Sequence, residues 1–275
     1  MVEWLAPGVG IGTEAPANWR PLAAGPLVVL VGVTGTGKST LLNRLTSAGL
    51  PLCSLPDRRV LTDRCIIAPL QQADGETPHT LRRIDRYPYV ERFQAAHPGG
   101  LAVVLASLQV DPAYGPAGWI FDGLRGVAEI THAVATLPHA RFLACTAPDP
   151  LRIRRIAGRN DPHDISAAQA DTAEVWQELL ALPGVDAVLS LDDLAALRAW
   201  AARAGVPPAV LYEATRIVVR ERRVFNPNKT VVALRALAPE RALVLDTALL
   251  SAEHCARVAL RWLAQVRTED KEAFL

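Results

Sequence analysis

The sequence predicts an α/β fold with three layers, in which a mostly parallel sheet of five strands lies between two layers of helices. The first observation is that short apolar runs alternate along the chain with longer segments of helical periodicity. The second is that half of the 275 residues are hydrophobic, which is enough to build an extended core. No apolar run reaches the roughly eighteen residues of a membrane-spanning helix, so no membrane partner is expected.

The first 26 residues are rich in proline, glycine and alanine. We expect residues 1–26 to form an N-terminal extension that packs on the surface of a domain covering residues 27–275. Trp4 and Trp19 are its candidate packing anchors, since large aromatic side chains more often pack than contact ligands.

The core begins with Leu27–Val31, an apolar run that predicts a buried strand. The glycine-rich segment GVTGTGKS at 32–39 follows, and a leucine-rich segment of helical spacing comes next. Glycines in such a loop let backbone N–H groups converge on phosphate oxygens at the positive end of the helix. Only three of the 29 basic residues (Lys and Arg) are lysines, so a lysine at this position is informative.

This loop predicts the binding of ATP, or another nucleoside triphosphate, together with Mg²⁺. Lys38 can reach the β- and γ-phosphates, and the Ser39 hydroxyl can ligate the magnesium ion. The residues expected to contact the nucleotide at the loop are Gly32, Thr34, Gly35, Thr36, Gly37, Lys38, Ser39 and Thr40.

Residues 52–100 are expected to form the site of a second substrate. The stretch from Leu52 to Ile67 indicates a loop with a short strand, and 71–79 is polar and turn-rich. Tyr87 and Tyr89 can stack on a base or close the edge of the core. The interval is also rich in arginine, and contact of some of these side chains with an anion is expected, although each alone is equally typical of a surface: Arg58, Arg59, Arg64, Arg82, Arg83, Arg86 and Arg92.

A helix is expected from Leu101 to Gln109, and the next predicted strand, Trp119–Asp122, ends in a carboxylate. Asp122 is a candidate to hold magnesium, with Ser39, or to orient the acceptor. An ordinary aspartate at the end of a strand is the alternative. Arg125 lies on the same loop and is a candidate contact for an anionic acceptor.

A helix from Val127 to Thr136 and a strand from Arg141 to Cys145 lead to an arginine-rich helix, Leu151–Arg159. Its Arg152, Arg155 and Arg159 are spaced three and four apart, so they share one helical face. Such a face can neutralise the charge on a transferring phosphoryl group. The alternative is a solvated face whose arginines pair with nearby aspartates. His163 is expected to cap a helix.

The remainder of the chain is predicted to be mainly helical. A helix is expected from Ser166 to about Leu182, and 183–240 is expected to be a helical insertion. This insertion holds helices at 192–204 and 208–223 and a turn at 225–228. A last strand, Leu243–Asp246, and a closing helix, Ala252–Arg267, complete the predicted domain.

Charge and cysteine content restrict the partners and the compartment. A formal net charge of +1 argues against an attraction to nucleic acid that is wholly electrostatic. The four cysteines show no metal-ligand or paired redox spacing, and the N-terminus lacks the pattern of a signal peptide. We therefore expect a cytoplasmic protein with reduced thiols. Self-association into a homo-oligomer is left open.

The order of these motifs resembles that of P-loop kinases of the nucleoside-monophosphate-kinase type, including dephospho-coenzyme-A-kinase-like proteins. Four segments carry the resemblance: GVTGTGKS at 32–39, WIFDGLRGVAE at 119–129, RIRRIAGRND at 152–161 and LVLDT at 243–247. The resemblance as a whole extends over about half of the chain, and residues 1–26 and about 183–240 have no counterpart in it.

The resemblance implies a P-loop NTPase fold and a set of site residues. Lys38 and Ser39 would bind phosphate and magnesium, and Asp122 would serve the active site. Arg125 would face the acceptor. A lid at about 151–166 would carry Arg152, Arg155 and Arg159, which would close over the phosphates. Thr247 and Ala248 would lie beside the adenine.

The resulting hypothesis is ATP- and Mg²⁺-dependent phosphoryl transfer to a small anionic acceptor such as a nucleotide. One alternative is a nucleoside-triphosphate-hydrolysing switch, which would not need an arginine-rich acceptor region and lid. Another is a kinase that acts on nucleic-acid ends, which the near-neutral charge disfavours.

Overall fold

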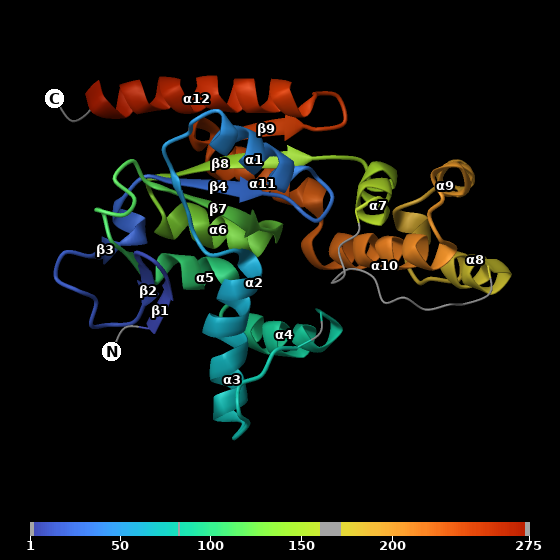
Figure 1. Cartoon of the computed structure of the whole chain (residues 1–275), viewed down its shortest axis with the longest axis horizontal. Helices are drawn as coiled ribbons and strands as arrows, with labels where there is room; N and C mark the ends of the chain where they lie inside the picture. The colour runs from blue at the N-terminus through green and yellow to red at the C-terminus, as the bar shows by residue number, and fades with distance from the viewer. Residues whose placement is uncertain (1–2, 82, 160–171, 273–275) are drawn as a thin grey trace.

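A computed structural model describes residues 3–81, 83–159 and 172–272. Its centre is a five-stranded sheet in which every neighbouring pair is parallel, in the order β5-β7-β4-β8-β9 (Figure 1). The strands are β4 (Leu27–Val31), β5 (Cys53–Ser54), β7 (Trp119–Leu124), β8 (Ala140–Thr146) and β9 (Ala242–Asp246). The predicted three-layer fold with a five-stranded sheet is thus confirmed.

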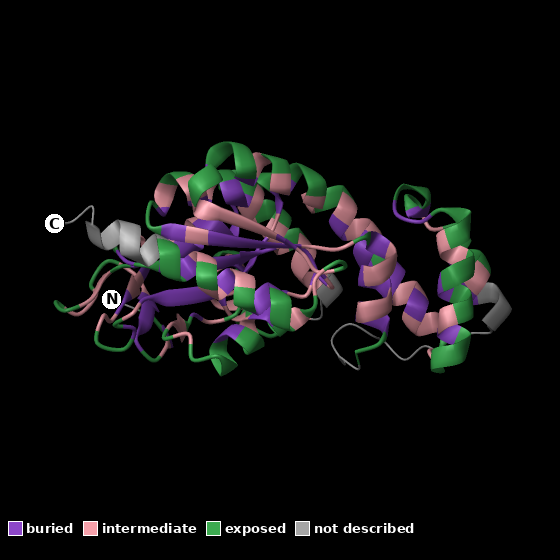
Figure 2. Ribbon diagram, turned by 90° about the horizontal axis from the view of Figure 1, so that it is seen from above, coloured by how far each residue is buried: buried purple, intermediate pink, exposed green. Residues whose placement is uncertain are grey.

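Helices cover both faces of this sheet because side chains alternate along each strand. Val29 and Val31 of β4 enter one core with α5 (Leu101–Ala106), α6 (Gly126–Thr136) and α11 (Pro227–Leu237). Val28 and Leu30 enter the opposite core with α1 (Lys38–Ser47) and α12 (Ala252–Glu272). The central strands β4, β7 and β8 are therefore largely buried on both faces, whereas the edge strands β5 and β9 are mostly only partly buried (Figure 2).

The position of a cleft at the sheet edge follows from this topology. Strands β4 and β7 are neighbours, but α1 follows β4 on one face and α6 follows β7 on the other. The loops after the two strands therefore diverge and leave a crevice at the carboxyl edge of the sheet, where ligands of such folds bind.

The first residues of the chain form a second, antiparallel sheet in the order β1-β2-β6-β3. Its strands are β1 (Glu3–Ala6), β2 (Val9–Ile11), β3 (Arg20–Pro21) and β6 (Leu108–Val110). The predicted helix 101–109 was therefore wrong at its end, because residues 108–110 pair with β2 and β3. The two candidate anchors contact each other, with the rings of Trp4 and Trp19 edge to face at 4.7 Å.

The stretch expected to be a loop with a short strand at 52–67 is mostly helical. After β5 come α2 (Arg58–Thr62), a π-helical turn η2 (Asp63–Ile67) and α3 (Ala68–Ala73). The Asp57 carboxylate accepts the Val60 N–H at 2.8 Å and so caps α2, a signal that the sequence contained. The segments η3 (Arg83–Arg86) and α4 (Tyr87–Ala96) follow.

A helical unit stands beside the sheet (Figures 1 and 2). It comprises α7 (Asp149–Ala157), α8 (Thr172–Leu180), η4 (Val185–Ala187), α9 (Leu191–Ala204) and α10 (Pro208–Phe225). These helices share their own core, which includes Ile153, Leu197 and Val218. The helix expected to form a lid and most of the expected insertion thus belong to one body. Residues 160–171, which include His163 and Ser166, lie outside the described part of the chain.

The end of the expected insertion belongs instead to the main domain. Helix α11 packs on α6 and β9, and its Leu234 is fully buried in the sheet core. The expected turn at 225–228 is shorter, because α11 already begins at Pro227. Asn226 lies in the left-handed region (φ 41°), and its side chain caps α11 by accepting the Lys229 N–H at 3.2 Å.

Candidate functional site

The glycine-rich loop connects β4 to α1, and its backbone requires glycine. Gly37 has φ 91° and immediately precedes the first residue of α1. Gly35 has φ 81°, and a Cβ there would lie 2.9 Å from the carbonyl oxygen of Arg152. The left-handed backbone therefore favours glycine at both positions, and the close approach of α7 excludes a side chain at Gly35 as well.

The backbone N–H groups at the centre of the loop are not used by other groups in the described part of the protein. Among the hydrogen bonds of the described residues, none is donated by the N–H of Gly35, Thr36 or Gly37. The first N–H groups of α1 also lack partners within the helix, as at any helix start. The Thr36 hydroxyl donates to the carbonyl of Val33 at 2.9 Å, which closes the loop from within. The arrangement fits an anion at the N-terminus of α1.

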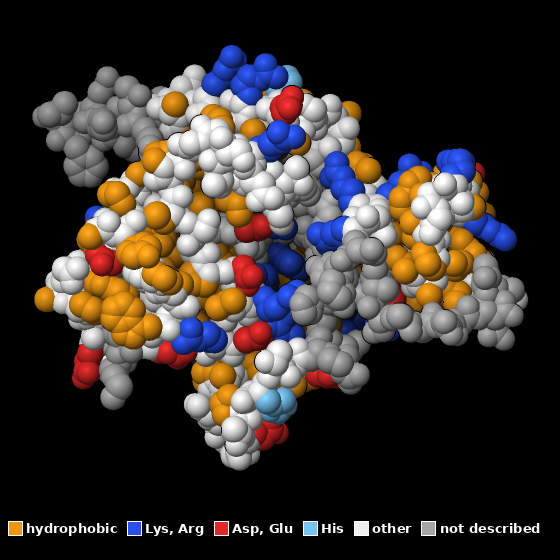
Figure 3. Space-filling model, viewed as in Figure 1, with side chains coloured by type: hydrophobic (Ala, Val, Ile, Leu, Met, Phe, Trp, Pro, Cys, Tyr) orange, Lys and Arg blue, Asp and Glu red, His pale blue; other side chains and the backbone are white. Residues whose placement is uncertain are grey.

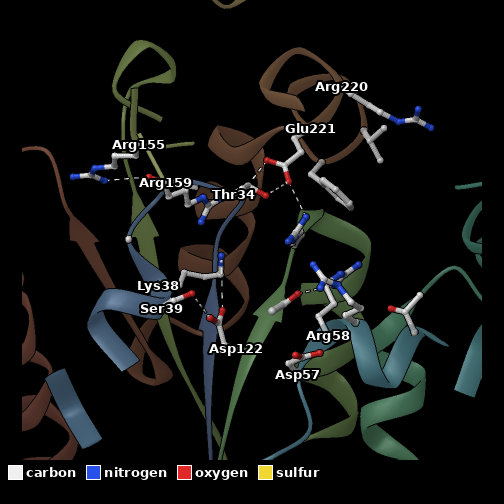
Figure 4. Close-up of a pocket in the computed structure, with 18 of the residues that line it drawn as sticks. Thr34, Lys38, Ser39, Asp57, Arg58, Asp122, Arg155, Arg159, Arg220 and Glu221 are labelled. Atoms are coloured by element: carbon white, nitrogen blue, oxygen red, sulfur yellow. Dashed lines mark hydrogen bonds and ion pairs between the residues drawn. The ribbon is translucent and has the colours of Figure 1, made fainter. Parts of the chain in front are cut away.

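Lys38, Ser39 and Asp122 meet beside this loop (Figure 4). Lys38 Nζ lies 3.8 Å from Asp122 Oδ1 and donates to the Val33 carbonyl at 3.2 Å. The Ser39 hydroxyl donates to Asp122 Oδ2 at 3.2 Å. Burial lowers the pKa of Lys38, and only 8% of this residue is exposed. A buried ammonium group beside a carboxylate suits a site that receives phosphate.

One oxygen of Asp122 accepts no hydrogen bond from the described residues, although it lies 3.8 Å from the Lys38 ammonium. Oδ1 is buried and has no hydrogen-bond partner among the described residues. Buried polar atoms rarely stay unpaired, because an unpaired one keeps the full cost of its lost hydration. No group of three or more His, Cys, Asp or Glu in the described ranges could hold a metal ion by itself. A cation at Asp122 would therefore need ligands from a bound molecule.

A cleft of about 960 Å³ opens at the loop, between the sheet and the helical unit. Figure 3 shows basic and acidic side chains gathered in this hollow. Basic residues outnumber acidic ones, which favours an anionic ligand. The basic residues of the lining are Lys38, Arg58, Arg59, Arg86, Arg125, Arg155, Arg159 and Arg220, and the acidic ones are Asp57, Asp63, Glu91, Asp122 and Glu221.

Most residues predicted to contact the nucleotide border this cleft. Thr34, Gly35, Gly37, Lys38, Ser39, Thr40 and Thr247 line it. Gly32 and Thr36 do not line it and contribute within the loop instead. Thr247 Oγ1 lies within hydrogen-bonding distance of the carbonyls of Thr36 (2.9 Å) and Thr146 (3.0 Å). It thereby connects the loop to the ends of β8 and β9, while Ala248 is not part of the lining.

The three arginines predicted to share a face of α7 have different environments. Arg155 lines the cleft and donates to Thr247 O at 2.7 Å and to Gly35 O at 3.2 Å. Arg159 lines the cleft and is exposed. Arg152 is fully buried and does not line the cleft. It instead donates to Thr34 O at 2.8 Å, and it pairs with two carboxylates, of Asp149 and Glu221, at 2.6 Å each.

Carboxylates already neutralise most arginines of the expected acceptor region. Arg58 pairs with Glu129 at 2.7 Å and donates to Gly123 O at 2.6 Å, so it links the end of β7 to α6. Arg86 pairs with Asp63, Arg92 with Asp74 and Arg64 with Glu3. The side chains of Arg82 and Arg83 are outside the described set.

Arg59 differs from these paired arginines. It lines the cleft, and no hydrogen bond or ion pair of its guanidinium is found among the described residues. The Tyr87 ring lies 3.3 Å from the Arg220 guanidinium, so it meets a cation of α10. Tyr89 instead contacts Glu76 through its hydroxyl at 3.3 Å.

Glu221 of α10 is a site residue that the sequence reasoning missed. It is 3% exposed and contacts the loop, Arg125 and Arg152. The available signal was a single carboxylate within the arginine-rich run 216–229. Its partners lie about 70 to 190 positions away, so no local pattern could identify them.

No protein-family model and no curated protein matches the sequence. Two solved structures are similar to the chain at the level of overall shape. One is a sugar kinase from Janibacter sp. HTCC2649 in an unliganded structure, with 16% identity, a TM-score of 0.39 and coverage of 87% of this chain and 94% of that one. The other is a candidate kinase from Chloroflexus aurantiacus J-10-fl, with 16% identity, a TM-score of 0.36 and coverage of 87% and 97%.

In the described ranges, no helix is both long and apolar enough to cross a membrane. Site and fold together define an α/β protein with a glycine-rich loop between β4 and α1, at the carboxyl edge of a parallel sheet.

Proposed function

We propose that this protein transfers a phosphoryl group from ATP, with Mg²⁺, to a small anionic acceptor such as a nucleotide. One observation carries the proposal. Lys38, Ser39 and Asp122 converge at the start of α1 and face a predominantly basic cleft. Its volume of about 960 Å³ is at the upper end of the range for ligand pockets, which leaves room for a second small molecule beside a triphosphate.

The donor would bind along the loop. Backbone N–H groups of Gly35 to Ser39 and the Lys38 ammonium would hold the phosphates. Ser39 and Asp122 would hold Mg²⁺, which would neutralise phosphate charge when bound. Asp122 Oδ1, which accepts no hydrogen bond from the described residues, fits this role, since Mg²⁺ in proteins commonly uses one or two carboxylates plus substrate phosphates. The lining near Thr247, with Leu250 and Cys255, would receive the adenine.

The acceptor would bind in the half of the cleft lined by α2 and α4. Arg59 and Arg125 are its candidate anion contacts, because both line the cleft. Asp57 lines the same region, and Figure 4 shows it together with Arg58 across the cleft from Lys38. Arg58 and Arg86 are paired with carboxylates, so they would stabilise the walls of the cleft instead of contacting the acceptor.

Arg155 and Arg159 would contact the phosphates from the side of α7. Because α7 shares a core with α8 to α10, we infer that any lid movement carries the whole helical unit. Closure of this body would exclude water and limit wasteful hydrolysis of ATP.

The test is ATP turnover against a panel of nucleotides, coenzyme precursors and oligonucleotides, with the product identified by mass. We expect one small acceptor to stimulate turnover and to be phosphorylated. Lys38→Ala should abolish turnover while leaving the circular-dichroism spectrum unchanged. Hydrolysis that no acceptor stimulates would favour the switch, and phosphorylated oligonucleotides would favour action on nucleic-acid ends. Retained turnover in Lys38→Ala would refute the assignment of the loop.

A further inference from the structure

A single buried carboxylate joins the glycine-rich loop to the helical unit. We propose that Glu221 is a positioning residue, through which the helical unit sets the geometry of the loop for nucleotide binding. This inference rests on the proposed function, because it assumes that the loop binds a nucleoside triphosphate. Glu221 need not touch the nucleotide to act in this way.

The contacts of Glu221 fix one residue of the loop. Its Oε2 accepts the backbone N–H of Thr34 at 2.9 Å, and its Oε1 accepts the Thr34 hydroxyl at 2.5 Å. Figure 4 shows Glu221 directed at Thr34, whereas Arg220, one position earlier on α10, points away. Glu221 is 3% exposed, so little water competes for these bonds.

The helical unit holds Thr34 from both sides. The N–H of Thr34 binds Glu221 of α10, and its carbonyl accepts from Arg152 Nε of α7 at 2.8 Å. The two holding side chains also bind each other, with Arg152 Nη2 at 2.6 Å from Glu221 Oε2. Next along the loop, the α7 backbone at Arg152 packs directly on Gly35. A displacement of α7 and α10 would therefore move the loop as well.

The same carboxylate orients a residue on the acceptor side. Arg125 Nη1 donates to Glu221 Oε1 at 2.7 Å, and the Arg125 guanidinium lies 5.9 Å from the centre of the Phe225 ring, one turn further along α10. Arg125 lines the cleft, so Glu221 connects the donor loop, an acceptor arginine and the proposed lid helix. A displacement of a substrate-positioning group by about 1 Å can lower the rate roughly a hundredfold. The contacts that Glu221 makes with both sides of the cleft can therefore affect catalysis.

The variant Glu221→Gln tests the inference, because the amide keeps the size but cannot accept from Thr34 and two arginines at once. The chain offers a matched control on the same helix. Glu213→Gln breaks an ion pair with Arg216 at 3.0 Å and lies outside the cleft lining and the loop contacts. We expect Glu221→Gln to weaken binding of a non-hydrolysable ATP analogue with Mg²⁺ at least tenfold. Its single-turnover rate should fall by about a hundredfold, while Glu213→Gln stays within about twofold of wild type.

A second variant keeps the inference testable if Glu221→Gln does not fold. Thr34→Val removes the hydroxyl bond to Glu221 and leaves the Thr34 backbone N–H in place. We expect Thr34→Val to weaken analogue binding several-fold. The double variant with Glu221→Gln should lose less affinity than the product of the two single losses, since both changes remove one contact.

The possible results separate this inference from the proposed function. If the wild-type protein binds no nucleoside triphosphate, both fail. If the wild type binds and Glu221→Gln binds equally well, only the positioning role fails. If Glu221→Gln does not fold, the Thr34→Val variant decides: wild-type affinity for the ATP analogue in this variant would overturn the positioning role of Glu221. Losses that multiply in the double variant would show that the two residues act independently, which also overturns it.

Discussion

Because Arg152 is buried, we expect its removal to lower the stability of the fold. Removal of an arginine that contacts phosphate would instead lower the rate of transfer. Arg152 is fully buried, and its two carboxylate partners, Glu221 and Asp149, are 3% and 7% exposed. Removing one member of a buried ion pair costs about 3–5 kcal/mol, because the remaining charge stays buried without compensation. Arg152→Ala should therefore destabilise the folded protein strongly.

The remaining contacts place the expected loss at the lower end of that range. Glu221 would keep Arg125 and the two donors of Thr34, and Asp149 would keep Arg222 at 3.4 Å. We therefore expect the free energy of unfolding to fall by about 3 kcal/mol. That is a large part of the roughly 5–15 kcal/mol that stabilises a typical domain.

Urea-induced unfolding, followed by circular dichroism and tryptophan fluorescence, measures this loss. The control is Arg155→Ala, since Arg155 is only partly buried and its hydrogen bonds go to uncharged groups. We expect this control to lose about 1 kcal/mol. If Arg152→Ala loses no more stability than Arg155→Ala, with equal slopes against urea, the buried ion-pair network does not stabilise the fold.

Three further predictions concern the cleft. Asp122→Asn should lower the single-turnover rate by at least a hundredfold and change affinity for the ATP analogue by less than about tenfold; a loss confined to affinity would contradict its role. Joint replacement of Arg155 and Arg159 by alanine should slow transfer at least tenfold, and an unchanged rate would make them surface residues. Burial lowers the pKa of Lys38, so between its folded and unfolded pKa values the unfolded state binds more protons, and stability should rise with pH there. Bound phosphate should raise the pKa of Lys38 again, so nucleotide binding should be accompanied by proton uptake. The affinity for nucleotide should therefore fall as the pH rises through the pKa that Lys38 has in the free protein. Calorimetry in two buffers of different ionisation enthalpy measures the uptake, and Lys38→Met should abolish it.

Elements with a strong local signal were predicted correctly. The apolar strand Leu27–Val31 matches β4, and α6 and β9 lie within one residue of their expected bounds. Buried parallel strands and amphipathic helices carry their periodicity within ten or so residues, so sequence alone can identify them. The short helix α2 is an intermediate case, because its Asp57 cap was present in the sequence and was not recognised.

Elements that depend on distant partners were missed. Residues 108–110 form a strand because β2 and β3 pair with them, and helical propensity could not reveal this. The arginines of residues 52–100 suggested a site for an anion, but Glu129, Asp63 and Asp74 neutralise three of them. Ion pairs between residues far apart in sequence leave no periodic pattern, so charge content alone overestimated the anion contacts.

The sequence by itself determined the α/β class and the position of the glycine-rich loop, and it named Asp122 as a candidate to hold magnesium or orient an acceptor. These depend on local periodicity and on a short motif whose backbone demands glycine. The tertiary structure decided that Arg152 is buried while Arg155 and Arg159 line the cleft. It also placed Glu221 against Thr34, although 187 positions separate them. Helical spacing defines a face, but only packing decides whether that face meets solvent, a ligand or another carboxylate.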